Sequence, residues 1–264
     1  MRWSEPQLAM LREIGIRVWV PPAQEDVAAA IAAVPAQPAD APTATHATPS
    51  SAVARERVDS AVVMHPAEAH DTSAIATLDW PALRDAVAGC TACKLCEGRR
   101  QTVFGVGNER AHWMIVGEAP GEQEDRQGEP FVGKSGQLLD NMLRAIALTR
   151  AEAEPARQVY IANTLKCRPP GNRNPEPDEM AKCEPFLIRQ LQLVQPRIIL
   201  AMGAFAVRSL LRSSEPVGKL RGRVHHYQGV PLIVTYHPAY LLRNPEDKAK
   251  AWDDLCLALE TVAA

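Results

Sequence analysis

The chain has 264 residues, enough for one or two domains with a sizeable buried core. It contains no run of about 18 apolar residues, which excludes a membrane-spanning helix. Its net charge of −2 permits a nucleic-acid partner without demanding one, because the charge is uneven. Residues 1–79 hold 5 Lys and Arg against 10 Asp and Glu, whereas residues 80–264 hold 24 against 21.

The N-terminal part consists of two regions of different composition. Residues 1–21 are predicted to form a short helix from Glu5 to Ile14 and then a short strand, "IRVWV". The first residues carry charge and lack the apolar core of a signal peptide, so we expect a cytoplasmic protein. Residues 22–77 are rich in Ala, Pro, Thr and Ser, with too few large apolar side chains to offset their ordering entropy. We expect a disordered linker there and one folded domain over residues 78–264.

From Leu78 onward, β-branched runs alternate with amphipathic helical patterns. Continuous apolar strands separated by helices predict a parallel sheet that is covered on both faces. We therefore expect a three-layer α/β/α sandwich with a four-stranded, mainly parallel central sheet. The predicted strands span 112–117, 159–163 and 197–202, a hairpin spans 221–236, and the helices span 134–148, 177–194, 203–212 and 246–262.

Functional loops of such a sheet gather at the carboxyl ends of its strands. Here those loops read "GEAPG", "NTLKCRPPGNRNP", "MGA" and "HPAYLLRNP". Three of the four are rich in polar and turn-forming residues. The sequence therefore predicts a functional site at this edge of the sheet.

One stretch, "GEPFVGKS" (128–135), fits the phosphate-binding pattern G-x-x-x-x-G-K-[ST]. A phosphate-binding loop directly follows its strand, whereas a long acidic insert separates this stretch from the strand that ends at Gly117. Pro130 also removes one of the backbone N–H donors that such a loop needs. We therefore expect that the chain does not bind a nucleotide triphosphate.

The six cysteines indicate a metal site or catalysis rather than disulfides, because we expect a cytoplasmic protein. Cys256 stands at helical spacing among leucines, which is typical of a core thiol. The other five lie beside basic and Pro-rich sequence. Four thiolates could bind zinc or a [4Fe–4S] cluster, and spacing alone does not distinguish the two. The candidates are Cys90, Cys93, Cys96, Cys167 and Cys183.

Three segments taken together, "VGEAPGEQEDRQGEPFVGKSGQLLD", "NTLKCRPPGNRNP" and "YHPAYLLRNP", closely resemble the family 4 (iron–sulfur) uracil-DNA glycosylases. The resemblance covers about residues 85–257. It implies the uracil-DNA glycosylase fold and hydrolysis of the N-glycosidic bond of deoxyuridine in DNA, the first step of base-excision repair. It also implies a monomeric enzyme that releases uracil and leaves an abasic site.

The resemblance implies catalytic roles for Glu118 and His237. Read alone, Glu118 is a solvated loop carboxylate; in the family it is required for activity, as a general base or as a stabiliser of cationic charge on the sugar. His237 alone could cap its strand. In the family it lies against uracil O2, where a neutral imidazole N–H stabilises the departing anion.

Uracil recognition is expected to involve four further residues. The backbone of Ala119 helps hold the attacking water, and Glu124 lines the pocket near uracil C5, where it excludes thymine's methyl group. Phe131 is flanked by Pro and Gly in a polar loop, so it is a better stacking candidate than most lone phenylalanines. The amide of Asn163 can accept from N3–H and donate to O4, although an Asn at a strand end is more often a turn former.

The same resemblance implies contacts to DNA and a cofactor. Two adjacent leucines in a loop are expected to insert into the duplex, and basic side chains nearby are expected to meet phosphates. The expected DNA contacts are Lys166, Arg168, Arg173, Leu241, Leu242 and Arg243, with Lys219, Arg221 and Arg223 as a second basic group. A [4Fe–4S] cluster is assigned to Cys90, Cys93, Cys167 and Cys183, which leaves Cys96 as the surplus thiol.

Other interpretations remain open on the sequence. A non-catalytic iron–sulfur protein that binds nucleic acid could share this fold. Relatives that trap the sugar covalently carry an extra His-containing basic loop after the first motif, and "GEPFVGKSG" continues without one. The segment "QLAMLREIGIRVWVPP" could add a strand to the domain, bind a repair or replication partner, or have no function.

Overall fold

The structure is a computed structural model that describes Glu13 and residues 72–263. Apart from Glu13, the predicted helix and strand of residues 1–21 lie outside the described residues, as do residues 22–71 of the predicted linker. Helix α3 (Thr72–Ile75) begins six residues before the predicted boundary at 78 and contacts α8 (Pro177–Val194), so the folded part starts inside the segment predicted as a linker. No described helix is long and apolar enough to span a membrane.

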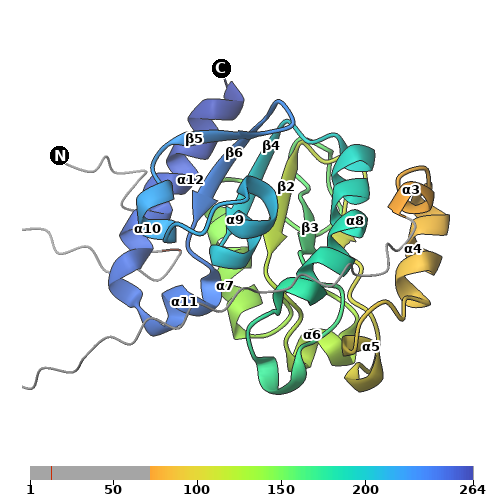
Figure 1. The fold of residues 1–264 in the computed structure, drawn as a ribbon. Coiled ribbons are helices and arrows are strands. Elements are labelled where there is room, and N and C mark those ends of the chain that lie inside the picture. The colour runs from red at the N-terminus through yellow and green to blue at the C-terminus, as the bar shows by residue number, and fades with distance from the viewer. Residues whose placement is uncertain (1–12, 14–71, 264) are drawn as a thin grey trace, which may run out of the picture. The chain divides into compact units, whose positions relative to one another are not determined.

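The centre of the fold is a mixed sheet in which the described residues form six strands, ordered β1-β3-β2-β4-β6-β5 (Figure 1). Its inner strands β3, β2, β4 and β6 run parallel, and β1 and β5 flank them in antiparallel orientation. The predicted four-stranded sheet was therefore too small, because the short edge strand β1 was missed and the hairpin adds β5. The strands are β1 (Val106–Gly107), β2 (Trp113–Gly117), β3 (Tyr160–Asn163), β4 (Ile198–Met202), β5 (Val224–Tyr227) and β6 (Val230–Thr235).

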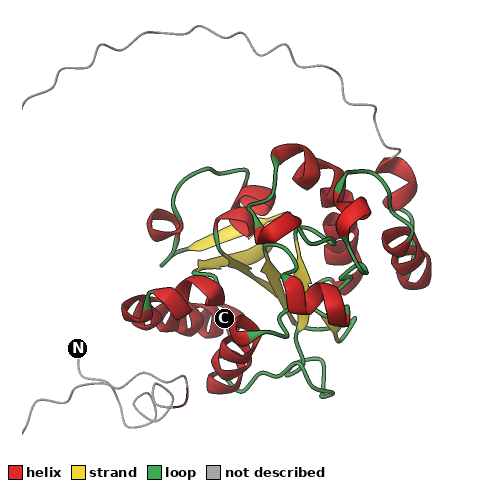
Figure 2. Cartoon of the chain, turned by 90° about the horizontal axis from the view of Figure 1, so that it is seen from below, coloured by secondary structure: helices red, strands yellow, loops and turns green. Residues whose placement is uncertain are grey.

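Helices cover both faces of this sheet (Figure 2). Helices α7 (Lys134–Ala145) and α12 (Lys248–Ala263) pack on one face, and α8 with α9 (Ala204–Leu211) packs on the other. The expected α/β/α layering is present. The shorter helices are α4 (Trp80–Ala88), α5 (Leu95–Gly98), α6 (Glu122–Gln127), α10 (Val217–Leu220) and α11 (Pro238–Arg243), and the 3-10 turns are η1 (Pro170–Asn172) and η2 (Pro245–Asp247).

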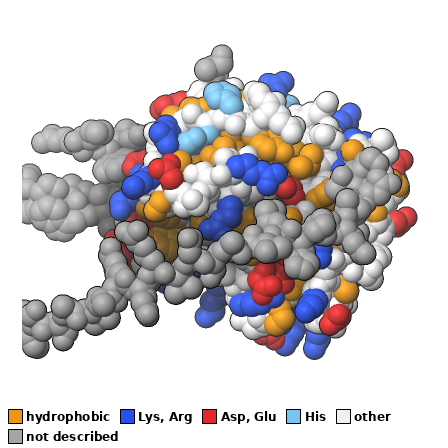
Figure 3. Space-filling model, viewed as in Figure 1, with side chains coloured by type: hydrophobic (Ala, Val, Ile, Leu, Met, Phe, Trp, Pro, Cys, Tyr) orange, Lys and Arg blue, Asp and Glu red, His pale blue; other side chains and the backbone are white. Residues whose placement is uncertain are grey.

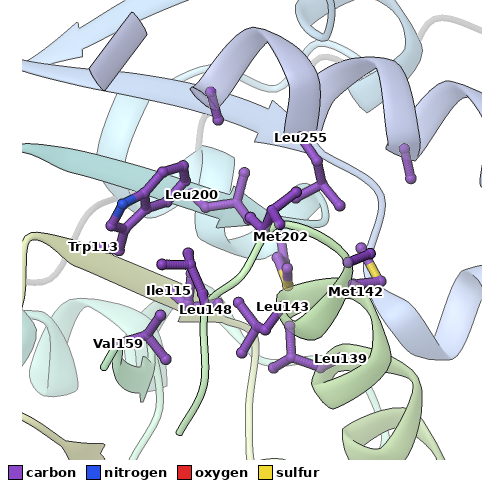
Figure 4. Packing of buried hydrophobic residues seen from close by; sticks show 14 of the residues in the cluster. Trp113, Ile115, Leu139, Met142, Leu143, Leu148, Val159, Leu200, Met202 and Leu255 are labelled. Carbon is purple, nitrogen blue, oxygen red and sulfur yellow. The ribbon is translucent and has the colours of Figure 1, made fainter. Parts of the chain in front are cut away.

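The alternation of side chains along each buried strand divides the apolar core between the two faces. In β2, Ile115 points to the α7 and α12 side, where it joins Leu139 and Leu255 (Figure 4). Its neighbours Met114 and Val116 point to the α8 and α9 side instead. Every residue of β2, β3 and β4 is buried, which explains why these strands read as continuous apolar runs.

Two smaller apolar clusters include side chains of α8. One joins α4 to α8 through Leu83, Val87 and Phe186, and the other surrounds Leu95 and Leu165. Helix α4 is capped at its N-terminus by Asp79, whose side chain accepts a hydrogen bond from the N–H of Ala82 at 3.0 Å. These clusters hold the cysteine-bearing segments against the main domain.

Candidate active site

A cleft of about 1010 Å³ opens where the parallel strands end. Its walls come from the segments that follow β2, β3, β4 and β6, as expected for an open α/β sheet. All six residues predicted for catalysis and uracil binding line it: Glu118, Ala119, Glu124, Phe131, Asn163 and His237. The structure therefore brings the four predicted functional loops together at one site.

Asn163 is the last residue of β3 and is paired in register with Gly117 of β2. The residue is only 2% exposed, and its Oδ1 has no hydrogen-bond partner among the described residues. A Cβ at Gly117 would lie 2.4 Å from this Oδ1, so only glycine permits the observed approach. A buried acceptor without a partner is costly, which marks Asn163 as a site for a ligand N–H.

Phe131 is held in an unusual backbone conformation, with φ of 56°. Glycines make room for it on two sides, because a Cβ at Gly117 would meet its ring at 2.6 Å and a Cβ at Gly136 would meet its carbonyl oxygen at 1.7 Å. Its ring stacks on His237, with centroids 5.3 Å apart and 27° between the planes. The predicted stacking residue and the predicted O2 donor thus form one wall of the cleft.

His237 follows β6 and caps helix α11. Its Nδ1 accepts from the N–H of Ala239 at 3.1 Å, so the proton of the neutral ring resides on Nε2. Burial, together with the charge of Arg243, lowers the pKa of His237 to about 4. At neutral pH this side chain is an uncharged N–H donor, as the sequence interpretation requires.

Glu118 directly follows β2 and lines the same cleft. Its carbonyl oxygen accepts from the N–H of Leu165 at 3.1 Å and from the hydroxyl of Thr164, which ties this loop to the segment after β3. Burial raises the pKa of Glu118 to about 7, although the guanidinium of Arg243 opposes the rise. A carboxylate with such a pKa can hold or release a proton near neutral pH.

Glu124 lies in α6, and both oxygens of its carboxylate accept hydrogen bonds from backbone N–H groups. Oε1 accepts from the N–H groups of Val132 and Gly133 at 2.9 and 3.1 Å, and Oε2 accepts from Gly121 at 3.1 Å. The carboxylate therefore clamps the loop that carries Phe131. It also occupies backbone donors of "GEPFVGKS" that a phosphate-binding loop would offer to a nucleotide.

The segment "PAYLLR" was expected to be a loop, but it forms helix α11, and the two leucines consequently point in different directions. Leu241 is 1% exposed and packs in the core beside α7, so its prediction as a DNA wedge was wrong. Leu242 is 44% exposed and keeps that prediction. Arg243 ends the helix and lines the cleft.

The predicted phosphate contacts Lys166, Arg168 and Arg173 also differ in their exposure. Lys166 is 2% exposed and its Nζ is bound internally, so its prediction as a DNA contact was wrong. Arg168 and Arg173 stay partly exposed, and each contacts a glutamate, at 3.7 Å to Glu122 and 2.6 Å to Glu179. On the face seen in Figure 3, basic and acidic side chains are interspersed around a stretch of apolar surface.

The second basic group, Lys219, Arg221 and Arg223, contains one residue that is paired within the protein and two that are exposed. Arg221 is bound by the buried Asp254, with 2.9 Å between Nη2 and Oδ1, and joins the segment after α10 to α12. Lys219 and Arg223 are exposed. Of the second basic group, Lys219 and Arg223 therefore remain candidates for a contact with DNA.

All five candidate metal ligands line one small cavity of about 20 Å³ between α4, α5 and α8. Each of these thiols is free of disulfides. Two of them accept hydrogen bonds at 3.2 Å, Cys167 from the guanidinium of Arg99 and Cys183 from the backbone N–H of Lys166. In the described part of the chain, no group of three or more His, Cys, Asp or Glu side chains could hold one metal ion. Cys256 lies apart on α12 and packs on the core, as predicted.

Sequence reasoning missed three aromatic residues of the cleft. Tyr236 and Tyr240 stack with centroids 4.9 Å apart, and Phe205 lines the wall formed by α9. Tyr236 precedes the N-cap of α11 and Tyr240 lies in its first turn, so their contact is expected only when a helix is recognised to begin at Pro238. Phe205 had no such signal.

Comparisons with known proteins identify the family. Residues 104–256 match the family model described as Uracil DNA glycosylase superfamily. The chain is 40% identical to the type-4 uracil-DNA glycosylase of Archaeoglobus fulgidus, over 61% of this chain and 81% of that protein. It is 41% identical to that of Thermotoga maritima (62% and 83%) and 38% identical to that of Pyrobaculum aerophilum (68% and 93%). The chain therefore belongs to the uracil-DNA glycosylase superfamily and, within it, to the type-4 family.

Proposed function

We propose that this chain hydrolyses the N-glycosidic bond of deoxyuridine in DNA and so initiates base-excision repair. The observation that carries the proposal is the buried, unpartnered Oδ1 of Asn163 beside Phe131, in a cleft shared with Glu118 and His237. An enzyme that acts on one base must extrude it and read its Watson–Crick edge. The unpartnered amide supplies the acceptor that uracil N3–H requires.

Each side chain has a distinct role in this proposal. Phe131 stacks on the extruded uracil, and Asn163 accepts from N3–H and donates to O4. In the transition state the C1′–N1 bond breaks, the sugar becomes cationic and the uracil anionic. The Nε2–H of neutral His237 stabilises charge on O2, while the carboxylate of Glu118 orients the water that adds to C1′ or balances the charge of the sugar.

The products are uracil and an abasic site. A strand-cleaving lyase would need an amine to form a Schiff base with the sugar. No described residue that lines the cleft is a lysine, and the buried Lys166 lies outside it. These observations support simple hydrolysis by water.

We further propose a [4Fe–4S] cluster at Cys90, Cys93, Cys167 and Cys183. The five candidate thiols line one cavity, and in a cluster each thiolate binds a different iron atom. N–H donors to cysteine sulfur, such as those at Cys167 and Cys183, are a usual accompaniment of cluster ligands. The cluster would fix the segments around it and supply no step of the hydrolysis.

Iron and sulfide analysis of anaerobically purified protein tests the cluster, together with its absorption spectrum. About four irons per chain are expected for the unchanged protein. Cys96→Ala should keep them, and the matched change Cys93→Ala should lose them. Zinc in place of iron would contradict the assignment.

The glycosylase activity is tested by incubating the protein with a uracil-containing oligonucleotide, followed by alkali, which cleaves at abasic sites. Asn163→Ala should lower the excision rate about 100-fold or more, because the N3–H of the bound uracil is then buried without an acceptor. Asn174→Ala is the matched control, since Asn174 lines the same cleft but is exposed. Intact strands with the unchanged protein would favour the non-catalytic alternative.

The proposal extends to DNA binding and to the N-terminal segment. Arg168, Arg173 and Arg243 are retained as phosphate contacts, and the enzyme acts as a monomer. We propose that the segment "QLAMLREIGIRVWVPP" is a motif for a repair or replication partner. A truncation should begin at Asp71, because removing α3 would disturb its packing on α8. Unchanged uracil excision with loss of partner binding is the expected result.

A further inference from the structure

Lys166 lies between the two sites of the proposed enzyme. Its Nζ donates to the backbone oxygen of Asn163 at 2.9 Å, while its own N–H donates to the sulfur of Cys183 at 3.2 Å. One residue thus contacts the strand end that reads uracil and a proposed cluster ligand. Burial to 2% exposure excludes a contact with DNA phosphate.

The hydrogen bonds of the Lys166 ammonium are all to neutral oxygens. Besides Asn163, Nζ donates to Oε1 of Gln190 at 2.6 Å. Gln190 is itself fixed, because its Nε2 donates to the carbonyl oxygen of Phe104 at 2.9 Å and to the hydroxyl of Tyr160 at 3.1 Å. This network places the ammonium rigidly under the peptide of Asn163.

The network leaves the charge of Lys166 without a carboxylate partner among the described residues. A buried ammonium is costly unless an anion lies near it. Two proposed cluster ligands lie beside it: Cys167 is the next residue along the chain, and the sulfur of Cys183 accepts from the backbone N–H of Lys166. Thiolates of these residues, bound to an anionic iron–sulfur group, would supply the missing negative charge.

We propose that Lys166 is a positioning residue that balances the charge of the iron–sulfur cluster and holds Asn163 in place for uracil. The inference rests on the proposed function and on the cluster assigned above. It predicts that the cluster and the uracil site share one determinant, although the cluster takes no part in hydrolysis.

The first test compares Lys166→Met with Lys182→Met. Lys182 lines the same cavity but is partly exposed and paired with Asp178 at 3.0 Å, so it is a matched control. Lys166→Met should lower the reduction potential of the cluster, because a nearby positive charge favours the reduced form. It should also weaken binding of free uracil more than about tenfold. Lys182→Met should leave uracil binding unchanged and lower the reduction potential less than Lys166→Met, because Lys182 is partly exposed and paired with Asp178.

Lys166→Arg separates the two roles, and it also serves if the Met variant does not fold. The guanidinium keeps the charge but cannot reproduce the donor geometry of an ammonium. The reduction potential should therefore stay near that of the unchanged protein, while uracil binding weakens. Equal loss of both properties would overturn the proposal.

A double-mutant cycle with Asn163→Ala tests whether Lys166 acts through Asn163. In that background, Lys166→Met should cause no further loss of uracil binding, yet should lower the reduction potential as before. Additive losses of binding would show that Lys166 acts elsewhere and would overturn the proposal. If the unchanged protein excised no uracil, the proposed function would fail separately, since the potential is measured without substrate.

Discussion

Glu118 and His237 share one cleft, yet the same burial moves their pKa values in opposite senses. Burial disfavours the charged form of each group, so the pKa of Glu118 rises to about 7 and that of His237 falls to about 4. At pH 8 the site therefore holds a carboxylate and a neutral imidazole. That combination suits a reaction in which positive charge develops on the sugar and negative charge on the base.

The first prediction concerns the pH dependence of uracil excision. Both roles considered for Glu118 require its ionised form, so the single-turnover rate should rise with pH through about 7 and then level off. Glu118→Gln should remove this rise and lower the plateau rate by about 10²- to 10⁴-fold. A rate that is constant from pH 5 to 8 in the unchanged protein would contradict the ionised role.

A second prediction distinguishes two roles of Glu124. If its carboxylate mainly clamps the Phe131 loop, Glu124→Gln should lower kcat/KM for uracil about tenfold or more, because hydrogen bonds to a charged group contribute about 1.5–3 kcal/mol. Glu122→Gln in the same helix is the control, since Glu122 is exposed and paired with Arg126. Unchanged uracil kinetics with new thymine excision would instead support a role only in excluding the methyl group.

At the scale of elements, α11 shows how a helix sorts two neighbouring side chains. Successive residues of a helix point about 100° apart, so Leu241 enters the core while Leu242 stays at the surface. The segment was expected to be a loop, although Pro238 stands at the first helical position, where proline is favoured because its missing N–H has no partner in a helix. Recognising that signal would have separated the two leucines in advance.

The third prediction follows from this separation. Leu241→Ala should lower the free energy of unfolding by about 2–5 kcal/mol, the usual cost of truncating a buried leucine. Leu242→Ala should leave stability nearly unchanged and slow uracil excision from duplex DNA more than from single strands, because only a duplex needs a wedge. Urea denaturation and excision assays on both substrates measure these effects. Equal slowing on both substrates would contradict the wedge.

The inner strands and long helices were predictable because their own residues determine them. Helix α8 was predicted at its observed bounds, since Pro177 favours the first turn and the apolar spacing ends at Val194. Strand β1 has only two residues and little pattern to detect. Burial of Lys166 could not be predicted, because lysine is almost never buried without tertiary partners and Gln190 lies 24 residues away.

The residues that line the cleft were easier to predict than the contacts that hold them in place. The residues of the cleft lie at strand ends, and parallel strands bring such ends to one edge whatever the detailed packing. The clamp formed by Glu124 and the lysine beneath Asn163 depend on contacts between separate loops. A pattern along one chain carries no record of such contacts.

At the scale of the whole molecule, the buried groups of the site make the stability of the fold depend on pH. The pKa of Glu118 is higher in the folded chain, about 7 against an ordinary 4.5, so the folded state keeps a proton that the unfolded state loses. Stability therefore falls as pH rises from 4.5 to 7. For His237, with a pKa of about 4 against an ordinary 6.5, the unfolded state holds the extra proton and stability rises between pH 4 and 6.5.

These two contributions, each worth about 3 kcal/mol, oppose one another over nearly the same pH range. The fourth prediction is that Glu118→Gln removes one of them and leaves the other. Relative to the unchanged protein, the free energy of unfolding of this variant should increase by about 3 kcal/mol as pH rises from 4.5 to 7, whereas His237→Asn should show the opposite trend. Urea denaturation at a series of pH values measures both, and subtraction removes the titration of surface carboxylates. If the free energy of unfolding had the same pH dependence in all three proteins, neither group would have the shifted pKa that burial in the cleft gives it.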